Sequence, residues 1–173
     1  MKVVDNFLPD DEFQSIRDEI LGNLFPWYWQ DNSHGYKFEG KWVDTDNVPQ
    51  LTHTLVDDGK ILSDFFSKIV KTDLFDKLKA KSVSKLKLNC NYKTSTQKVG
   101  FFHTDYRDDS MNDITTSILY FNTNNGGTKF EDDTFVNSIA NRVVTFKCSA
   151  KHAPVSCTDE HRRVVLNINY YEK

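Results

Sequence analysis

The sequence lacks paired cysteines, long apolar runs and a large excess of charge, and each absence argues against a class of protein. The three cysteines, Cys90, Cys148 and Cys157, are widely spaced and form no Cys-X-X-Cys pair, which argues against a disulfide framework or a structural zinc site. No apolar run reaches the roughly 18 residues of a membrane-spanning helix. At the N-terminus an acid, Asp5, comes before any apolar run, so we expect no signal peptide.

The net charge is also small. It is −3, with an isoelectric point near 5.9, which argues against a nucleic-acid coat protein and against a membrane-surface protein. An odd number of scattered cysteines fits a reducing compartment, so we expect a cytoplasmic protein. Lysine far outnumbers arginine and asparagine is common. This bias is typical of an A/T-rich genome, for example that of a phage whose proteins act in the host cytoplasm.

The chain does contain enough apolar residues for one folded domain. It has 173 residues, of which 38% are hydrophobic and 13% aromatic. It shows no internal repeat and no low-complexity linker. We therefore expect a single domain over residues 1–173, with helical support in about 1–82 and a β core in about 83–171.

Helical periodicity is confined to the N-terminal part. A first helix is expected to begin with Asp10 or Asp11 as its cap and to end at Gly22. A second is expected over about 59–71, followed by a helical turn at 74–78. Between them lies the aromatic segment 25–29, which either packs in the core or forms one wall of a substrate cleft.

From residue 83 onwards the pattern changes to an alternation of polar and apolar residues, which is typical of strands. Short strands separated by turns, with no helix between them, predict a β-sandwich or a small barrel. The expected strands cover residues 83–92, the segment around 103, 115–122, 128–130, 134–136, 142–147 and 163–170.

The most informative motif is His103-Thr104-Asp105. In an extended backbone the imidazole and the carboxylate lie on one face, since they are two positions apart. A second imidazole, His152, follows 47 residues after Asp105. Two histidines and one carboxylate are the ligand set of non-haem Fe(II) oxygenases, in which the remaining coordination positions stay open. We therefore take these three residues as candidate metal ligands.

The C-terminal half as a whole resembles the Fe(II)/2-oxoglutarate-dependent dioxygenases, in particular the prolyl 4-hydroxylase-like group. The resemblance covers roughly residues 83–171. The matching pieces follow the family's order: Tyr92, His103 and Asp105, Ile118–Asn122 with Gly126-Gly127, Val143–Phe146, His152, Pro154-Val155 and Arg163–Asn167. The spacing departs from the family after His152, because Pro154 follows by two positions where four is usual and no glycine precedes the arginine.

The resemblance implies a mainly β protein with N-terminal helices (α+β), whose core is a double-stranded β-helix, a jelly-roll or cupin-like barrel. It implies that His103, Asp105 and His152 hold Fe(II), and that 2-oxoglutarate binds the metal. It also implies a basic residue for the distal carboxylate of 2-oxoglutarate, a role that suits the two parallel hydrogen bonds of a guanidinium. Tyr120 is expected to help hold that carboxylate, and Tyr92 to lie near the co-substrate or to be a core aromatic.

Spacing permits either Arg162 or Arg163 as the basic residue, and alternation favours Arg163. Its face of the strand carries Val165, Asn167 and Asn169, whereas the face of Arg162 is apolar. The apolar face should meet the helices and the polar face should line the pocket. The other histidines, His34, His53 and His161, lie in irregular or polar segments and are not expected to be ligands.

These inferences lead to one main hypothesis and several alternatives. The main hypothesis is an enzyme that hydroxylates an unactivated C–H bond on a protein or peptide side chain, with proline as the first guess. It would use O2, convert 2-oxoglutarate to succinate and CO2, and have ascorbate as a candidate reductant. Residues 25–45 and 106–113 would contact the substrate. The alternatives are an oxygenase for a small molecule or a nucleobase, a cupin-type metalloprotein, and a non-catalytic jelly-roll module, for example in a virion.

Overall fold

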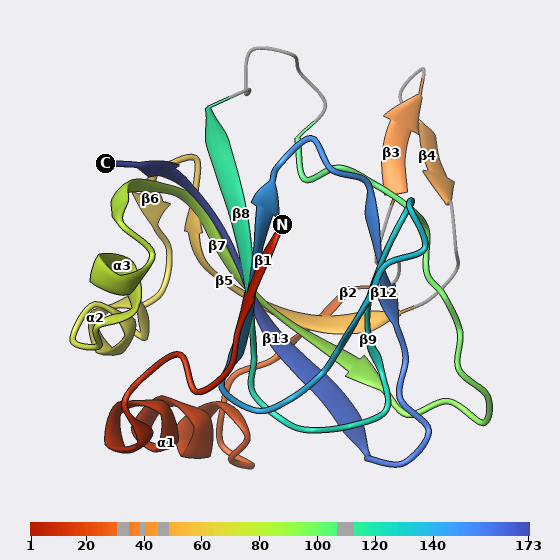
Figure 1. The fold of residues 1–173 in the computed structure, drawn as a ribbon. Helices are drawn as coiled ribbons and strands as arrows, with labels where there is room; N and C mark the ends of the chain where they lie inside the picture. The colour runs from red at the N-terminus through yellow and green to blue at the C-terminus, as the bar shows by residue number, and fades with distance from the viewer. Residues whose placement is uncertain (31–34, 39–40, 45–48, 107–112) are drawn as a thin grey trace.

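The computed structural model describes residues 1–30, 35–38, 41–44, 49–106 and 113–173. The fold is built on one large antiparallel sheet (Figure 1). Its strand order is β1-β11-β8-β13-β7-β5-β2, and β6 pairs with β5. In that order the bounds are β1 (Lys2–Val4), β11 (Arg142–Lys147), β8 (Ile114–Tyr120), β13 (Arg162–Glu172), β7 (Ala80–Tyr92), β5 (Gln50–Asp57), β2 (Tyr28–Gln30) and β6 (Lys60–Ile61).

A smaller sheet faces the large one and closes the barrel. It consists of β10 (Phe135–Asn137), β9 (Gly127–Phe130) and β12 (His152–Val155). Residues 99–103 extend it through single bridges between Val99 and Val155 and between His103 and His152. This arrangement of two antiparallel sheets confirms the predicted double-stranded β-helix. A separate hairpin is formed by β3 (Gly35–Phe38) and β4 (Lys41–Asp44).

Gly127 is needed where β9 and β10 pair. A Cβ at this position would lie 2.3 Å from the carbonyl oxygen of Val136, a distance at which backbone would have to move. Only glycine allows the two strands to approach so closely.

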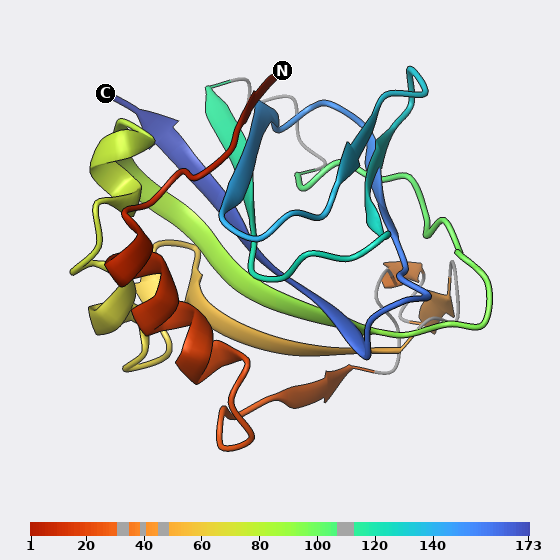
Figure 2. The ribbon, with the colours of Figure 1, turned by 60° about the horizontal axis from the view of Figure 1, so that its bottom comes forward.

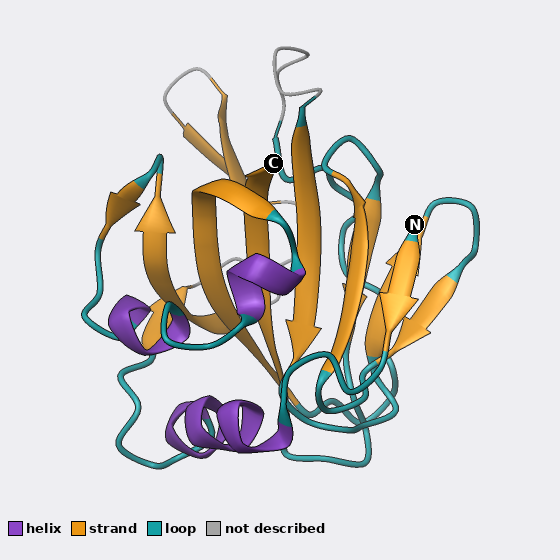
Figure 3. Ribbon diagram, turned by 60° about the vertical axis from the view of Figure 1, so that its left-hand side comes forward, coloured by secondary structure: helices purple, strands orange, loops and turns teal. Residues whose placement is uncertain are grey.

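The helices cover one face of the large sheet, opposite the small sheet (Figures 2 and 3). They are α1 (Asp10–Ile20), α2 (Phe66–Ile69) and α3 (Leu74–Lys77). α1 buries Phe13, Ile16 and Ile20 against the sheet, because these side chains recur at helical spacing. The main core therefore lies between the helices and the outer face of β7 and β13. A second, smaller apolar cluster lies inside the barrel and includes Ile118, Phe130 and Val165.

Several strands agree with the alternation in the sequence. β7, β8, β9, β10, β11 and β13 lie within a few residues of the expected ranges. The helical turn at 74–78 is confirmed as α3. No helix among the described residues is long and apolar enough to cross a membrane.

Two expectations for the helices are wrong. The first residue flanking α1 is Pro9, and no side chain caps the helix. The predicted helix over 59–71 is mostly not helical: β6 occupies Lys60–Ile61 and only α2 is helical. The apolar periodicity was misleading there because Ile61 and Leu62 are 63% and 61% exposed and take no part in the core.

The segment around His103 is not a regular strand, because it pairs with β12 only through isolated bridges. The strands β2, β5 and β12 were not expected. In β5 the outward residues Leu51, His53 and Leu55 alternate with Thr52 and Thr54, so a strand pattern was present in the sequence.

Candidate active site

His103, Asp105 and His152 meet at the mouth of the barrel. Their ligand atoms all lie within 4.8 Å of one another. Asp105 Oδ1 lies 4.0 Å from His103 Nε2 and 3.9 Å from His152 Nε2. These separations are too long for hydrogen bonds and leave space between the three side chains. The sequence separates the two histidines by 49 positions, and the bridge between 103 and 152 brings them together.

Both imidazoles are oriented by backbone carbonyl groups. His103 Nδ1 lies 3.0 Å from the carbonyl oxygen of Phe101, and His152 Nδ1 lies 3.1 Å from that of Ala150. A carbonyl can only accept, so each Nδ1 carries the proton and each Nε2 presents its lone pair. This second hydrogen bond is the arrangement that fixes a histidine as a metal ligand. His152 is buried, and the ring of Phe146 packs edge-on against it at 4.8 Å between centroids.

Asp105 is held by three donors from the large sheet. Asn167 Nδ2 donates to Oδ1 at 3.1 Å, and Thr116 Oγ1 and Asn169 Nδ2 donate to Oδ2 at 2.9 and 2.8 Å. Burial alone would raise the pKa of Asp105, but the electrostatic attraction of the nearby His152 and His103 and these hydrogen bonds outweigh it and lower the pKa below its usual value. The side chain is therefore a fixed, ionised carboxylate.

Arg163 lies inside the barrel and is almost fully buried, with 2% of its surface exposed. Its partners are neutral: Nη1 donates to Asn91 Oδ1 at 3.3 Å and Nη2 to Thr128 Oγ1 at 3.2 Å. Among the described residues, Nε has no partner and no carboxylate pairs with the guanidinium. Burial lowers the pKa of Arg163, because removing the charge from water is unfavourable. The arrangement is a buried cation that lacks an anion.

Tyr120 lies beside this arginine. Its ring centroid is 5.5 Å from the guanidinium carbon, and its hydroxyl donates to Thr128 Oγ1 at 2.8 Å. Burial raises the pKa of Tyr120, so the phenol stays protonated and can donate. The structure thus brings Tyr120, Thr128 and Arg163 together around one point.

The adjacent arginine points the other way. Arg162 donates through Nη2 to the carbonyl oxygen of Leu21, beyond the end of α1 on the outer face. Tyr92 lies opposite Arg162 in the register of β7 and β13, is 41% exposed and contacts the ring of Trp29. The structure therefore places Tyr92 away from Arg163, and Asn91 occupies the position that the sequence argument gave to Tyr92.

A chain of polar side chains runs along the inner face from β7 to β5 and β2, and it was not expected from the sequence. Asn91 Nδ2 donates to Gln50 Oε1 at 3.4 Å, and Gln50 Nε2 donates to Gln30 Oε1 at 3.3 Å. Lys87 Nζ donates to the same Gln30 oxygen at 3.2 Å. The polar members of the strand alternation could have indicated these residues, because Lys87 and Asn91 share a face with Lys85 and Asn89.

The remaining histidines lie elsewhere. His53 is buried between the carbonyl oxygen of Pro26 and the hydroxyl of Ser63, at 2.6 and 2.7 Å, and His161 is exposed. His34 lies outside the described residues. So do 107–112 and parts of 31–45, within the segments 106–113 and 25–45 that were expected to contact the substrate. Within segment 25–29, Phe25 is buried in the core whereas Tyr28 and Trp29 are exposed.

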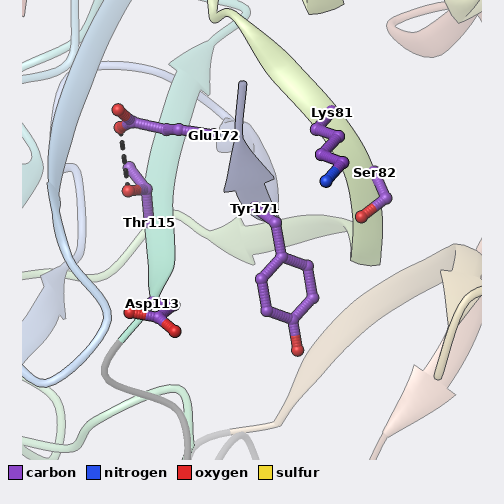
Figure 4. Close-up of a pocket in the computed structure, with 6 residues that line it drawn as sticks. All are labelled: Lys81, Ser82, Asp113, Thr115, Tyr171 and Glu172. Atoms are coloured by element: carbon purple, nitrogen blue, oxygen red, sulfur yellow. Dashed lines mark hydrogen bonds between the residues drawn. The ribbon is translucent and has the colours of Figure 1, made fainter.

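A shallow hollow lies where β7 begins and β13 ends (Figure 4). Its lining consists of Lys81, Ser82, Asp113, Thr115, Tyr171 and Glu172. Thr115 donates to Glu172 across it at 2.9 Å. It contains none of the candidate ligands and has no buried unpaired charge, so we do not regard it as the active site.

Comparison with known proteins agrees with this fold. No family model matches the sequence, and no curated protein sequence matches it. Among solved structures, the chain is similar to a prolyl-4-hydroxylase from Pseudomonas putida, with 13% identity, a TM-score of 0.60, and coverage of 99% of this chain and 92% of that one. It is also similar to a prolyl hydroxylase from Trichoplax adhaerens, in complex with a hypoxia inducible factor oxygen degradation domain peptide fragment.

The match to the Trichoplax protein has 14% identity and a TM-score of 0.62, and covers 99% of this chain and 83% of that one. A third similar structure is a 2OG-Fe(II) oxygenase family oxidoreductase from Burkholderia pseudomallei. There the identity is 11% and the TM-score 0.51, over 73% of this chain and 68% of that one. At these identities the comparisons show a shared fold, and the resemblance seen in the sequence is confirmed at that level.

Proposed function

We propose that this chain is an Fe(II)- and 2-oxoglutarate-dependent oxygenase that hydroxylates an unactivated C–H bond on a protein or peptide side chain. The observation that carries the proposal is the presence, inside one barrel, of a His-Asp-His cluster and a buried arginine that pairs with no described carboxylate. The His-Asp-His cluster would hold the iron, and the arginine would hold 2-oxoglutarate. When bound, Fe(II) and 2-oxoglutarate supply the oxidation: O2 is consumed, 2-oxoglutarate becomes succinate and CO2, and one oxygen atom enters the substrate.

The donor set fits Fe(II). His103 and His152 offer neutral imidazole nitrogens whose orientation is fixed by backbone carbonyl groups. Asp105 stays ionised and would offset part of the metal's charge. Three protein ligands leave coordination positions open, as a redox reaction with a bound co-substrate requires.

The buried end of the barrel fits the distal carboxylate of 2-oxoglutarate. Arg163 can donate to it from Nε, which has no partner among the described residues, and from a terminal nitrogen. Tyr120 and Thr128 offer hydroxyl groups at the same point. An arriving carboxylate would neutralise a cation whose burial is otherwise unfavourable, so binding and charge compensation would occur together.

A peptide is the first substrate class to test, because one of the similar structures is a prolyl hydroxylase in complex with a peptide fragment. The exposed rings of Tyr28 and Trp29 lie on β2, the edge strand of the large sheet, where a peptide could contact them. The three free cysteines are all buried, in keeping with the reducing cytoplasm that we expect.

The proposal is tested by anaerobic titration of the protein with Fe(II) and then 2-oxoglutarate. A visible charge-transfer band is expected when the keto acid chelates the metal. His103→Ala should abolish the band, whereas His161→Ala, which changes an exposed histidine, should leave it unchanged. A wild-type protein that binds iron fully but gives no band would contradict the oxygenase and favour a binding or structural barrel.

A further inference from the structure

The inner wall of the large sheet is polar beside the candidate metal ligands. β7 and β13 are the central strands, yet their inward side chains Lys87, Asn89 and Asn167 are only partly buried. The neighbouring outward side chains, Leu86 and Leu88, are fully buried. Side chains of central strands stay partly accessible only where nothing fills the space in front of them, so this wall borders an opening in the barrel.

Lys87 is a cation of this wall, and no described carboxylate forms an ion pair with it. Its Nζ donates to the neutral Gln30, and among the described residues no carboxylate lies within 4.0 Å of it. Lys85, two positions earlier on the same face, is different because its Nζ lies 3.8 Å from Asp57 Oδ1. Lys87 is therefore held in place by a neutral acceptor while its charge remains uncompensated.

Burial lowers the pKa of Lys87 to about 8, with a smaller contribution from the charge of Lys85. The opposing charges of Asp57 and Asp105 do not restore the usual value. An isolated lysine in this position is unfavourable for folding, as a leucine or methionine would not be. Its presence points to a partner that the described residues do not supply.

The position of Lys87 connects it to the reacting centre. In the register of the sheet it lies directly opposite Asn167, whose amide donates to Asp105. It is also linked through Gln30, Gln50 and Asn91 to Arg163. A group bound at Lys87 would thus lie beside the metal ligands, on the side of β5 and β2.

We propose that Lys87 binds a carboxylate of the substrate, so that the substrate is an acidic side chain or acidic small molecule and not a proline. This inference rests on the proposed function and specifies its substrate class. A proline ring is apolar, so beside this wall it would leave the charge of Lys87 uncompensated and the amide of Asn89 without a partner. A carboxylate compensates the single charge of Lys87.

Asn89 supports a carboxylate at this place. It lies between Lys87 and Asn91 on the same face, and among the described residues its side chain makes no hydrogen bond. Its amide can donate to the second oxygen of a carboxylate whose first oxygen accepts from Lys87. One positive charge balances one negative charge, which fits a carboxylate better than a phosphate monoester with its second charge.

The test uses NMR of the full-length protein loaded with Zn(II) as a diamagnetic stand-in, with 2-oxoglutarate at saturation. The Nζ resonance of Lys87 is identified by its loss in Lys87→Arg. The probes are N-acetyl-L-aspartate methylamide and its asparagine and proline counterparts. We expect the aspartate probe to shift this resonance saturably and to bind about tenfold tighter than either neutral probe.

Lys87→Met should lower the affinity for the aspartate probe about tenfold and leave the affinity for 2-oxoglutarate unchanged. Lys85→Met is the matched control and should alter neither. Equal binding of the proline and aspartate probes would overturn the inference, as would no shift with the aspartate probe. Weaker 2-oxoglutarate binding in Lys87→Met would also overturn it, because Lys87 would then serve the co-substrate.

Two further comparisons separate related outcomes. Tighter binding of the capped probe than of free L-aspartate would assign the carboxylate to a peptide side chain, and the reverse order to a small molecule; both support a carboxylate at Lys87. If 2-oxoglutarate itself does not perturb the Nε resonance of Arg163, the proposed function fails, and this outcome is distinct from failure of the inference about Lys87.

Discussion

The two faces of the β7–β13 strand pair differ in almost every respect. The outer face is apolar and fully buried under the helices, with Leu88, Val164 and Leu166 at its centre. The inner face carries Arg163, Asn167 and Lys87, which are charged or polar and only partly compensated. Because adjacent residues of a strand point to opposite faces, one strand contributes alternately to the core and to the site.

This difference indicates a division of labour. The outer face supplies the apolar burial that stabilises the fold, at roughly 25 cal/mol per Å² of apolar surface removed from water. The inner face contains charges that oppose folding until ligands compensate them. Substitutions on the outer face should therefore lower stability and leave ligand binding intact. Substitutions on the inner face should weaken ligand binding without lowering stability.

The largest expected effect is on the outer face. Leu166→Ala removes a fully buried side chain that faces Leu88 and Leu119 in neighbouring strands. The free energy of unfolding should fall by about 3 kcal/mol, measured by urea denaturation. Leu62→Ala is the control, because Leu62 is 61% exposed and should change stability little. A weaker Fe(II) affinity of folded Leu166→Ala would contradict the separation of the two faces.

The next effect concerns the metal. His103→Ala removes one candidate ligand, and we expect Fe(II) affinity to fall at least about 100-fold, because loss of second-sphere contacts alone costs about 10- to 100-fold. His161→Ala, at an exposed position, should bind as wild type does. Anaerobic competition with a chelator measures both. Equal affinities in the two variants would remove His103 from the metal site.

A third prediction is that an inner-face substitution increases stability. Lys87→Met removes a charge whose pKa is lowered to about 8. Below about pH 8 both folded and unfolded chains are protonated at this residue, and the folded state bears the full penalty of the buried charge. The variant should therefore be more stable at pH 7 by about 2 kcal/mol.

The lowered pKa of Lys87 also determines how the unfolding free energy changes with pH. Between about pH 8 and 10.5 the unfolded chain keeps a proton that the folded protein has released, so the unfolding free energy of the wild type rises with pH in this window. The advantage of Lys87→Met should shrink accordingly toward pH 10.5. Chemical denaturation at several pH values measures the difference. An advantage that does not change with pH would show that the charge of Lys87 is not its cause.

The smallest effect is expected from a residue that only orients a ligand. Asn167→Ala removes one of the three donors to Asp105 and leaves Thr116 and Asn169 in place. We expect about a tenfold loss of Fe(II) affinity, at the low end of what second-sphere contacts contribute. Asn89→Ala, which makes no hydrogen bond to Asp105, should bind iron as the wild type does. A loss as large as that of His103→Ala would mean that Asn167 determines the fold of the site.

The sequence was most informative where alternation was regular. The strands β7 and β13 could be predicted because polar and apolar residues alternate along much of their length, and the alternation also gave Arg163 a different face from Arg162. The same argument, carried through β7, would have placed Tyr92 on the apolar face with Leu88 and Cys90, and Asn91 on the polar face. The family resemblance favoured Tyr92 as the residue near the co-substrate, but the alternation along β7 places Asn91 on that face.

Other features depend on contacts that periodicity does not record. The helix expected over 59–71 rested on apolar side chains such as Ile61 and Leu62, and only their exposure in the folded chain shows that they do not form a buried face. Lys87 donates to Gln30 on β2, and Asn91, which accepts from Arg163, donates to Gln50 on β5; β2 and β5 are distant in sequence from β13. Such pairings follow from sheet order, which local pattern cannot supply.

The most direct test of the account is calorimetric titration of 2-oxoglutarate into the Mn(II)-loaded protein, comparing Arg163→Met with Arg162→Met. The two arginines are adjacent in sequence and lie on opposite faces of the strand. We expect at least about a tenfold loss of affinity in Arg163→Met and none in Arg162→Met. Equal losses in the two variants, or an unchanged affinity for 2-oxoglutarate in Arg163→Met, would contradict the claim that the inner face of the barrel is the co-substrate site.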